Sequence, residues 1–159
     1  MIKLTTVILT LALAAVAGSA QALDRKAFSG NGCEAYFGSN EADLDASIYG
    51  IHNRASGNRW VSCPIVRDNT TNTNGTSVVW VGADKGVGTL SCYLRSQQGQ
   101  GSNVTSDSAF TSAFGKQWLR LDVNSSSNYG YYMLYCSLPS NSRIASYHVE
   151  EFTFTDVNN

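Results

Sequence analysis

The chain has 159 residues and a formal net charge of −1, and only 14% of its residues are charged. It shows no cluster of Lys and Arg, which excludes an ordinary nucleic-acid-binding class because phosphate recognition needs concentrated positive charge. The abundance of Ser, Thr, Asn and Gly is typical of exported β-proteins and excludes a coiled coil or a highly charged disordered chain.

The N-terminal segment is predicted to be an export signal that is cleaved after residue 22. Lys3 supplies its positive charge, residues 7–17 form an apolar core, and Ala20-Gln21-Ala22 gives the small-x-small pattern that signal peptidase reads. The apolar run is shorter than the ~20 residues that a membrane span needs. We therefore expect residues 23–159 to form one domain, secreted or periplasmic, with no membrane insertion after cleavage.

Short β-type segments follow, separated by clusters of Gly, Asn and Ser, and no helical apolar period appears among them. Seven or eight strands in a chain of this length predict an all-β fold, an antiparallel β-sandwich that is immunoglobulin-like or jelly-roll-like. The segments 68–76 and 97–108 are polar and are expected to be surface loops. The predicted strands are 35–37 (a short edge strand), 46–53, 60–67, 76–83, 89–96, 117–123, 131–138 and 145–154.

Alternation of apolar and polar residues predicts which face of each strand is buried. The last strand changes phase, because Tyr147 and Val149 share one face while Phe152 and Phe154 fall on the other. A bulge near Glu150–Glu151 would bring them to one side. The other residues expected to face the core are Val61, Cys63 and Ile65; Leu90, Cys92 and Leu94; Leu119, Leu121 and Val123; and Tyr132, Leu134, Cys136 and Leu138.

Four cysteines follow the signal, namely Cys33, Cys63, Cys92 and Cys136, and none forms a C-x-x-C pair. An even count in an exported chain predicts two disulfides, with three possible connectivities. We favour Cys33–Cys63 and Cys92–Cys136, because Cys92 and Cys136 both lie on apolar faces and their bridge would sit in the core. The spacing does not favour a zinc site or a thioredoxin-like site.

No catalytic constellation is evident, and the protein is not expected to be an enzyme. The chain has two histidines, His52 and His148, and lacks the G-x-S-x-G motif of a nucleophile elbow. Glu150 and Glu151 are adjacent on a strand, so their carboxylates should point to opposite faces. A hydrolase with an unrecognised site is kept as a second alternative.

Metal ligands are also sparse, and we expect no metal and no cofactor. Glu41, Asp43 and Asp45 alternate along one segment, and Asp68 opens a loop rich in amide oxygens. The first group lacks the turn glycine and the bidentate Glu of an EF-hand, and the second has a single carboxylate. A calcium site in one of these loops is left open.

Aromatic residues are the strongest candidates for binding. Tyr131 and Tyr135 alternate with Met133 on the predicted outer face, Tyr129 lies beside them, and Trp80 is a further candidate. Trp118 is also expected to face outward. Flat rings on one sheet face can stack on sugar rings, unless a loop or a protein neighbour covers them. The candidate ligand-binding residues are Trp80, Tyr129, Tyr131 and Tyr135.

Four short motifs are spread along most of the chain after the signal: "CPIVRD" (63–68), "SCYL" (91–94), "YCSLP" (135–139) and "IASYHVEE" (144–151). Together with Cys33, this pattern resembles small exported bacterial proteins of unknown function. The resemblance implies a compact β-sandwich and an exported location, and implies no activity for Arg67 or Asp68. We expect a non-catalytic binding or surface-structural module whose partner is a protein or a glycan at the cell exterior, with carbohydrate binding as the first alternative.

Overall fold

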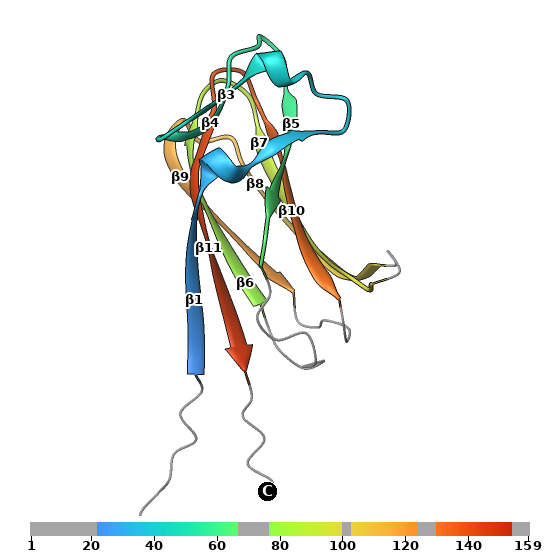
Figure 1. Ribbon diagram of the computed structural model, residues 1–159. Helices are drawn as coiled ribbons and strands as arrows, with labels where there is room; N and C mark the ends of the chain where they lie inside the picture. Colours follow the sequence, from blue (N-terminus) through green and yellow to red (C-terminus); the bar gives the residue numbers. More distant parts are fainter. Residues whose placement is uncertain (1–21, 67–76, 100–102, 124–129, 154–159) are drawn as a thin grey trace, which may run out of the picture.

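The computed structural model describes residues 22–66, 77–99, 103–123 and 130–153 (Figure 1). Within these ranges, side chains are described for residues 25–66, 77–99, 105–123 and 130–151. The described residues form eleven strands and two single-turn 3-10 helices. The elements are β1 (Ala22–Ser29), η1 (Gly30–Gly32), β2 (Glu34–Tyr36), η2 (Glu41–Asp43), β3 (Leu44–Ser47), β4 (Gly50–Asn53), β5 (Arg59–Pro64), β6 (Ser77–Lys85), β7 (Leu90–Gln97), β8 (Asn103–Thr111), β9 (Gly115–Val123), β10 (Tyr131–Leu138) and β11 (Arg143–Thr153).

The strands form two antiparallel sheets that pack face to face, which confirms the predicted β-sandwich. One sheet, here the β11 sheet, has the order β3-β4-β11-β6-β9, and β1 pairs with β11 beyond the end of β4. The other, here the β10 sheet, has the order β2-β5-β10-β7-β8. In Figure 1, β1 and β11 run side by side toward the end of the sandwich opposite η2. No helix among the described residues is long and apolar enough to cross a membrane.

The hydrophobic core lies between the two sheets and is built by the predicted alternation. In β7, Leu90, Cys92 and Leu94 are buried, whereas the residues between them are half-buried on the outer face. The same period holds in β9, and in β10 the predicted inward residues are all buried. Val61 and Cys63 are buried on β5, and Ile65 packs against the core from just beyond it.

Two disulfides, Cys33–Cys63 and Cys92–Cys136, confirm the predicted connectivity. Cys92 and Cys136 are direct partners in the pairing of β7 with β10. Cys33 comes immediately before β2, and β2 pairs with the strand that carries Cys63. Both bridges therefore join neighbouring strands of the β10 sheet, and apolar packing holds the two sheets together.

The segment 46–53, predicted as one strand, is a hairpin of β3 and β4, and the prediction was wrong. The chain turns at Ile48 and Tyr49 and re-enters the sheet at Gly50, whose φ of 106° is a conformation that L side chains rarely adopt. A Cβ at Gly50 would lie 1.9 Å from the carbonyl oxygen of Ile144. The glycine therefore marks both the turn and a close approach of two backbones.

Two further strands escaped prediction. β1 begins at the last residue of the predicted signal, and β8 occupies the second half of the segment 97–108 that was expected to be a loop. β8 is an edge strand of the β10 sheet, and only Ala109 among its described side chains packs against the core. A strand with so little apolar contact shows no apolar alternation. The predicted loop 68–76 lies outside the described residues.

The predicted bulge near Glu150–Glu151 is also wrong. β11 pairs with β6 and with β1 without interruption through both residues, and its register shifts instead between Ile144 and Ser146. Glu151 consequently shares the inner face with Tyr147 and Val149 and is buried. The register shift lies where β11 stops pairing with β4 and begins to pair with β1, so it accommodates this change of partner strand.

Candidate functional site

The outer face of the β10 sheet carries four aromatic side chains, each from a different strand, which form an aromatic cluster. Trp60 of β5 is the cross-strand partner of Tyr36 on β2, and Tyr135 of β10 is the partner of Tyr93 on β7. The rings of Tyr93 and Tyr135 stack with centroids 5.4 Å apart. Tyr36 and Trp60 contact Tyr135 at 5.6 and 6.1 Å. Cross-strand pairing thus makes one continuous surface of rings.

A hollow of about 180 Å³ opens in this cluster, lined by Tyr36, Phe37, Trp60, Arg95 and Tyr135. Phe37 is 79% exposed and stands at its rim. The guanidinium of Arg95 lies 5.1 Å from the centroid of the Tyr135 ring, within the range of a cation–π contact. The Tyr135 hydroxyl is buried and has no hydrogen-bond partner among the residues that the structure describes. Burial raises the pKa of this phenol, an effect that the charge of Arg95 partly opposes.

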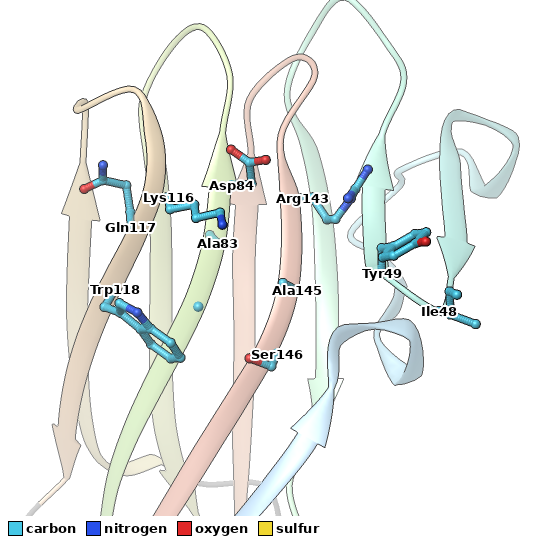
Figure 2. A pocket seen from close by; sticks show the side chains of 11 residues that line it. Ile48, Tyr49, Ala83, Asp84, Lys116, Gln117, Trp118, Arg143, Ala145 and Ser146 are labelled. Atoms are coloured by element: carbon cyan, nitrogen blue, oxygen red, sulfur yellow. The ribbon is translucent and has the colours of Figure 1, made fainter.

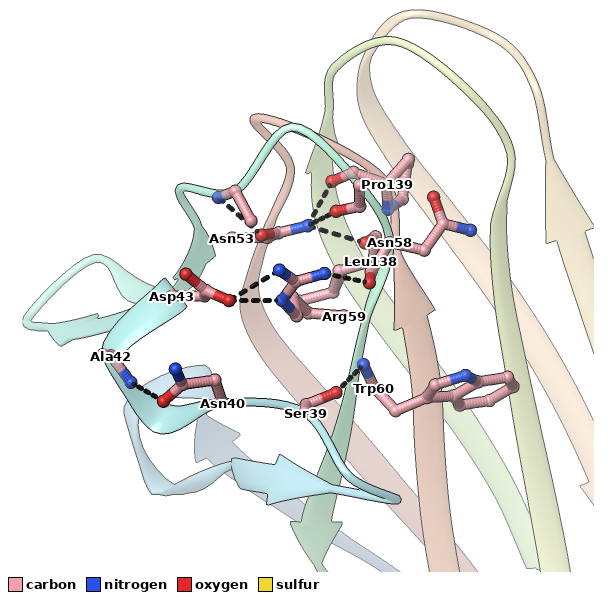
Figure 3. Close-up of polar contacts among 12 residues, drawn as sticks. Ser39, Asn40, Ala42, Asp43, Asn53, Asn58, Arg59, Trp60, Leu138 and Pro139 are labelled. Atoms are coloured by element: carbon pink, nitrogen blue, oxygen red, sulfur yellow. Dashed lines mark hydrogen bonds and ion pairs between the residues drawn. The ribbon is translucent and has the colours of Figure 1, made fainter.

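The loop between β2 and β3 is fixed against the cluster by polar contacts (Figure 3). The Ser39 hydroxyl accepts a hydrogen bond of 2.7 Å from the backbone N–H of Trp60. Arg59, the preceding residue, donates to the Asp43 carboxylate of η2 at 2.7 Å. Positive φ values at Phe37 and Gly38 make the turn that leads into this loop. These contacts hold Trp60 and the Phe37 rim in place.

A second hollow, here the β11-sheet groove, lies on the outer face of the opposite sheet and has a volume of about 340 Å³ (Figure 2). Trp118 of β9 rests its six-membered ring on Gly82 of β6, where an added Cβ would lie 2.9 Å from the ring. The indole is nevertheless 59% exposed. Tyr49, in the β3–β4 turn, is 65% exposed and lies on the other side of the groove. Two open aromatic rings thus flank one groove.

Polar side chains lie between these two rings. Strand register places Asp84 of β6 beside Lys116 of β9 on one side and Arg143 of β11 on the other. The guanidinium of Arg143 lies 5.9 Å from the centroid of the Tyr49 ring, and its Nε is buried without a hydrogen-bond partner in the described part of the chain. Gln117 and Ser146 complete the polar lining. The groove therefore combines hydrogen-bond donors, a carboxylate acceptor and exposed rings.

The structure does not bring the four predicted binding residues together. Tyr135 lies in the aromatic cluster but is only 7% exposed, and Tyr131 is 42% exposed farther along the same face of β10. Trp80 lies on the β11 sheet, where the Arg120 guanidinium is 5.9 Å from its ring. Tyr129 lies outside the described residues. Trp118, expected to face outward, does so.

Sequence reasoning missed Tyr36, Trp60 and Tyr49. The alternation along β5 indicates that Trp60 faces outward, because its neighbours Val61 and Cys63 face inward. Its neighbours could not be found in this way, since the order and register of the strands decide which outward rings meet. Tyr49 was assigned to a strand, whereas it lies in a turn.

Both histidines considered for catalysis, and two of the aspartates considered for metal binding, are engaged in structural contacts. The Nε2 of His52 is 3.0 Å from Oδ1 of Asn141, and His148 packs edge-on against Trp118. Asp43 pairs with Arg59, and Asp45 pairs with Arg54. Within the described ranges, no group of three His, Cys, Asp or Glu side chains could hold a metal ion.

Comparison with known proteins adds little. No protein-family model matches the sequence, and no curated protein matches it. Among solved structures, the enzymatically active domain of tailspike protein 4 from bacteriophage CBA120 superposes with a TM-score of 0.41 at 10% identity. The match covers 82% of this chain but only 19% of the tailspike chain. A likeness this distant carries no functional inference.

Proposed function

We propose that the protein is a non-catalytic, extracytoplasmic glycan-binding module that uses the β11-sheet groove. The observation that carries this proposal is the pair of exposed rings, Trp118 and Tyr49, on either side of a groove that contains polar side chains. Two disulfides support the compartment, because such bonds persist where the surroundings are oxidising.

Trp118 suits a stacking role because of what lies beneath it. Gly82 has no side chain, so the indole can settle on the sheet while much of its surface stays open to solvent. An exposed aromatic ring supported in this way offers its apolar face at a low cost in side-chain entropy. The C–H face of a sugar ring is the ligand surface that such a platform accommodates.

The polar lining suits the hydroxyl groups of a sugar. Asp84 can accept hydrogen bonds, Lys116 and Arg143 can donate them, and Gln117 can do both. A volume of about 340 Å³ falls at the lower end of the range of ~300–1,000 Å³ that is usual for small-ligand sites. A short stretch of an oligosaccharide is therefore a better match than a large protein surface.

The test is a glycan array followed by titration of the best ligand, with the indole N–H resonances of the three tryptophans as reporters. Trp118 should respond, and Trp118→Ala should weaken binding at least about tenfold. Phe110→Ala is the matched control, because Phe110 is also an exposed aromatic residue but lies on the opposite sheet. A folded protein that binds no glycan on the array would refute the function. Unchanged affinity in Trp118→Ala would refute the site, and release of shorter saccharides would refute the non-catalytic role.

A further inference from the structure

The hollow in the aromatic cluster contains hydrogen-bond donors that lack an acceptor among the described residues. We propose that it is a second binding site, on the face opposite the β11-sheet groove, for the carboxylate of an acidic saccharide such as a uronic acid. In this site Arg95 and Tyr135 bind the carboxylate, while Tyr36, Phe37 and Trp60 contact the ring of the sugar.

Arg95 is the first observation behind this assignment. The described ranges contain six arginines, and Arg25, Arg54, Arg59 and Arg120 each pair with a carboxylate. Arg95 lines the hollow, and its guanidinium lies over the face of the Tyr135 ring. A guanidinium is planar and carries five N–H groups in a fork that fits a carboxylate with two parallel hydrogen bonds. An arginine that lies on a ring, with no acidic partner in the part of the chain that the structure describes, is therefore prepared for one that comes from a ligand.

The Tyr135 hydroxyl is the second observation. The side chain is more than nine-tenths buried and its hydroxyl finds no partner within the described ranges, although burying an unpaired polar group costs free energy. Because burial raises the pKa of this phenol above its ordinary value of 10.0, the group stays protonated at neutral pH and can act as a donor. A carboxylate bound by Arg95 would supply an acceptor next to the ring that carries this hydroxyl.

The charge of the lining separates this hollow from the β11-sheet groove. The side chains that line it are four aromatic residues and one arginine, with no acidic residue among them. The groove on the other sheet contains Asp84 between two cations, so a negative ligand gains less there. On the outer face of the β10 sheet, the carboxylate of Glu34 lies on β2, three strands away from Arg95 on β7. Charge complementarity therefore favours an anion in the hollow.

The aromatic lining decides what kind of anion fits. Trp60 and Tyr36 are half-buried, and each is tilted against Tyr135, by 47° and 38°, so the three rings make a curved apolar wall beside Arg95. A bare inorganic anion would leave this wall unused. A sugar ring that bears a carboxylate packs its C–H face against this wall and places its charge beside the guanidinium. The volume of about 180 Å³ suits a single sugar unit.

The test compares methyl glucuronide with methyl glucoside, which share a ring and differ in the carboxylate. Titration of the intact protein should shift the indole N–H resonance of Trp60, while the resonance of Trp80 stays in place. The glucuronide should bind at least about tenfold more tightly than the glucoside. Arg95→Gln should abolish that preference, and Tyr135→Phe, which keeps the ring but removes the hydroxyl, should reduce it.

Two further variants keep the test decisive. Arg120→Gln is the matched control, because Arg120 also lies over an aromatic ring but on the opposite sheet, and it should leave glucuronide binding unchanged. Arg95→Lys retains the charge and should restore part of the preference if Arg95→Gln alters the cluster. Equal affinity for the two glycosides, or a preference that survives Arg95→Gln, would overturn the proposal. A response at Trp118 without one at Trp60 would also overturn it, and would leave the β11-sheet groove as a glycan site.

Discussion

Asn53 offers the sharpest test of what holds the loops around the two sites. Its side chain is fully buried, and Nδ2 donates to the carbonyl oxygens of Gly57, Leu138 and Pro139 at 2.8, 2.9 and 3.1 Å (Figure 3). Its Oδ1 accepts the backbone N–H of Ala55 at 2.9 Å. An amide has two N–H groups, so one of them is shared between two carbonyls. One side chain thus joins β4, the loop before β5 and the end of β10.

Asn53→Ala removes all of these contacts. Gly57 and Ala55 lie in an accessible loop where water can replace the lost partner, whereas the carbonyls of Leu138 and Pro139 are buried. Each buried group left without a partner costs ~1–3 kcal/mol, so the expected loss of unfolding free energy is about 3 kcal/mol. Asn53→Asp should lose at least as much, because a carboxylate oxygen would then face carbonyl oxygens.

The assay is equilibrium unfolding in urea, with the slope m expected to stay unchanged because the native fold is kept. The control is Asn58→Ala, since Asn58 is exposed and makes one side-chain hydrogen bond, to Ser137 at 3.2 Å. That variant should lose about 0.5 kcal/mol or less. A loss below about 1 kcal/mol for Asn53→Ala would show that the buried carbonyls do not depend on this side chain.

Three other perturbations test separate parts of the fold. Gly50→Ala should cost about 3 kcal/mol or more in urea unfolding, because of the positive φ and the contact with Ile144, whereas Gly32→Ala, with no atom within 4 Å, should cost little. Replacing Cys92 and Cys136 together by Ala should cost about 4 kcal/mol in the same assay, as expected for a bridge that spans 44 residues, and a fully stable variant would contradict this. Burial raises the pKa of Tyr147 to about 12, so its contribution to stability is complete below pH 10 and declines as the pH rises from 10 to 12. Tyr147→Phe should weaken this pH dependence, with Tyr135 accounting for a remainder, as followed by tyrosinate absorbance and urea unfolding.

The alternation of side chains explains why most of the sandwich could be predicted from the sequence. In β7, β9 and β10 the inward positions are continuous runs of apolar residues, so the period of two is visible without knowing any partner strand. The same reasoning paired Cys92 with Cys136, since both lie on inward faces. β8 could not be predicted in this way, because an edge strand with polar side chains makes few contacts with the core and its sequence shows no apolar alternation.

The residues that meet in the candidate sites are decided by the order of the strands in each sheet, which the sequence of a single strand does not reveal. Tyr135 could be assigned to an outer face, but its contact with Tyr36 and Trp60 follows from the order β2-β5-β10, which brings together segments far apart in the chain. The space for Trp118 depends on Gly82 of the neighbouring strand. Trp80 was a reasonable candidate as an outward tryptophan, yet it lies on the sheet opposite Tyr131 and Tyr135.

The glycan-binding function is tested most directly by titrating the intact protein with the best ligand from the array and recording the indole N–H resonances of Trp60, Trp80 and Trp118 together. A neutral oligosaccharide in the β11-sheet groove should shift Trp118 in a saturable manner, and Trp118→Ala should weaken its binding. If every array glycan leaves the Trp118 resonance in place while the protein remains folded, the β11-sheet groove is not a glycan site and the proposed function is wrong.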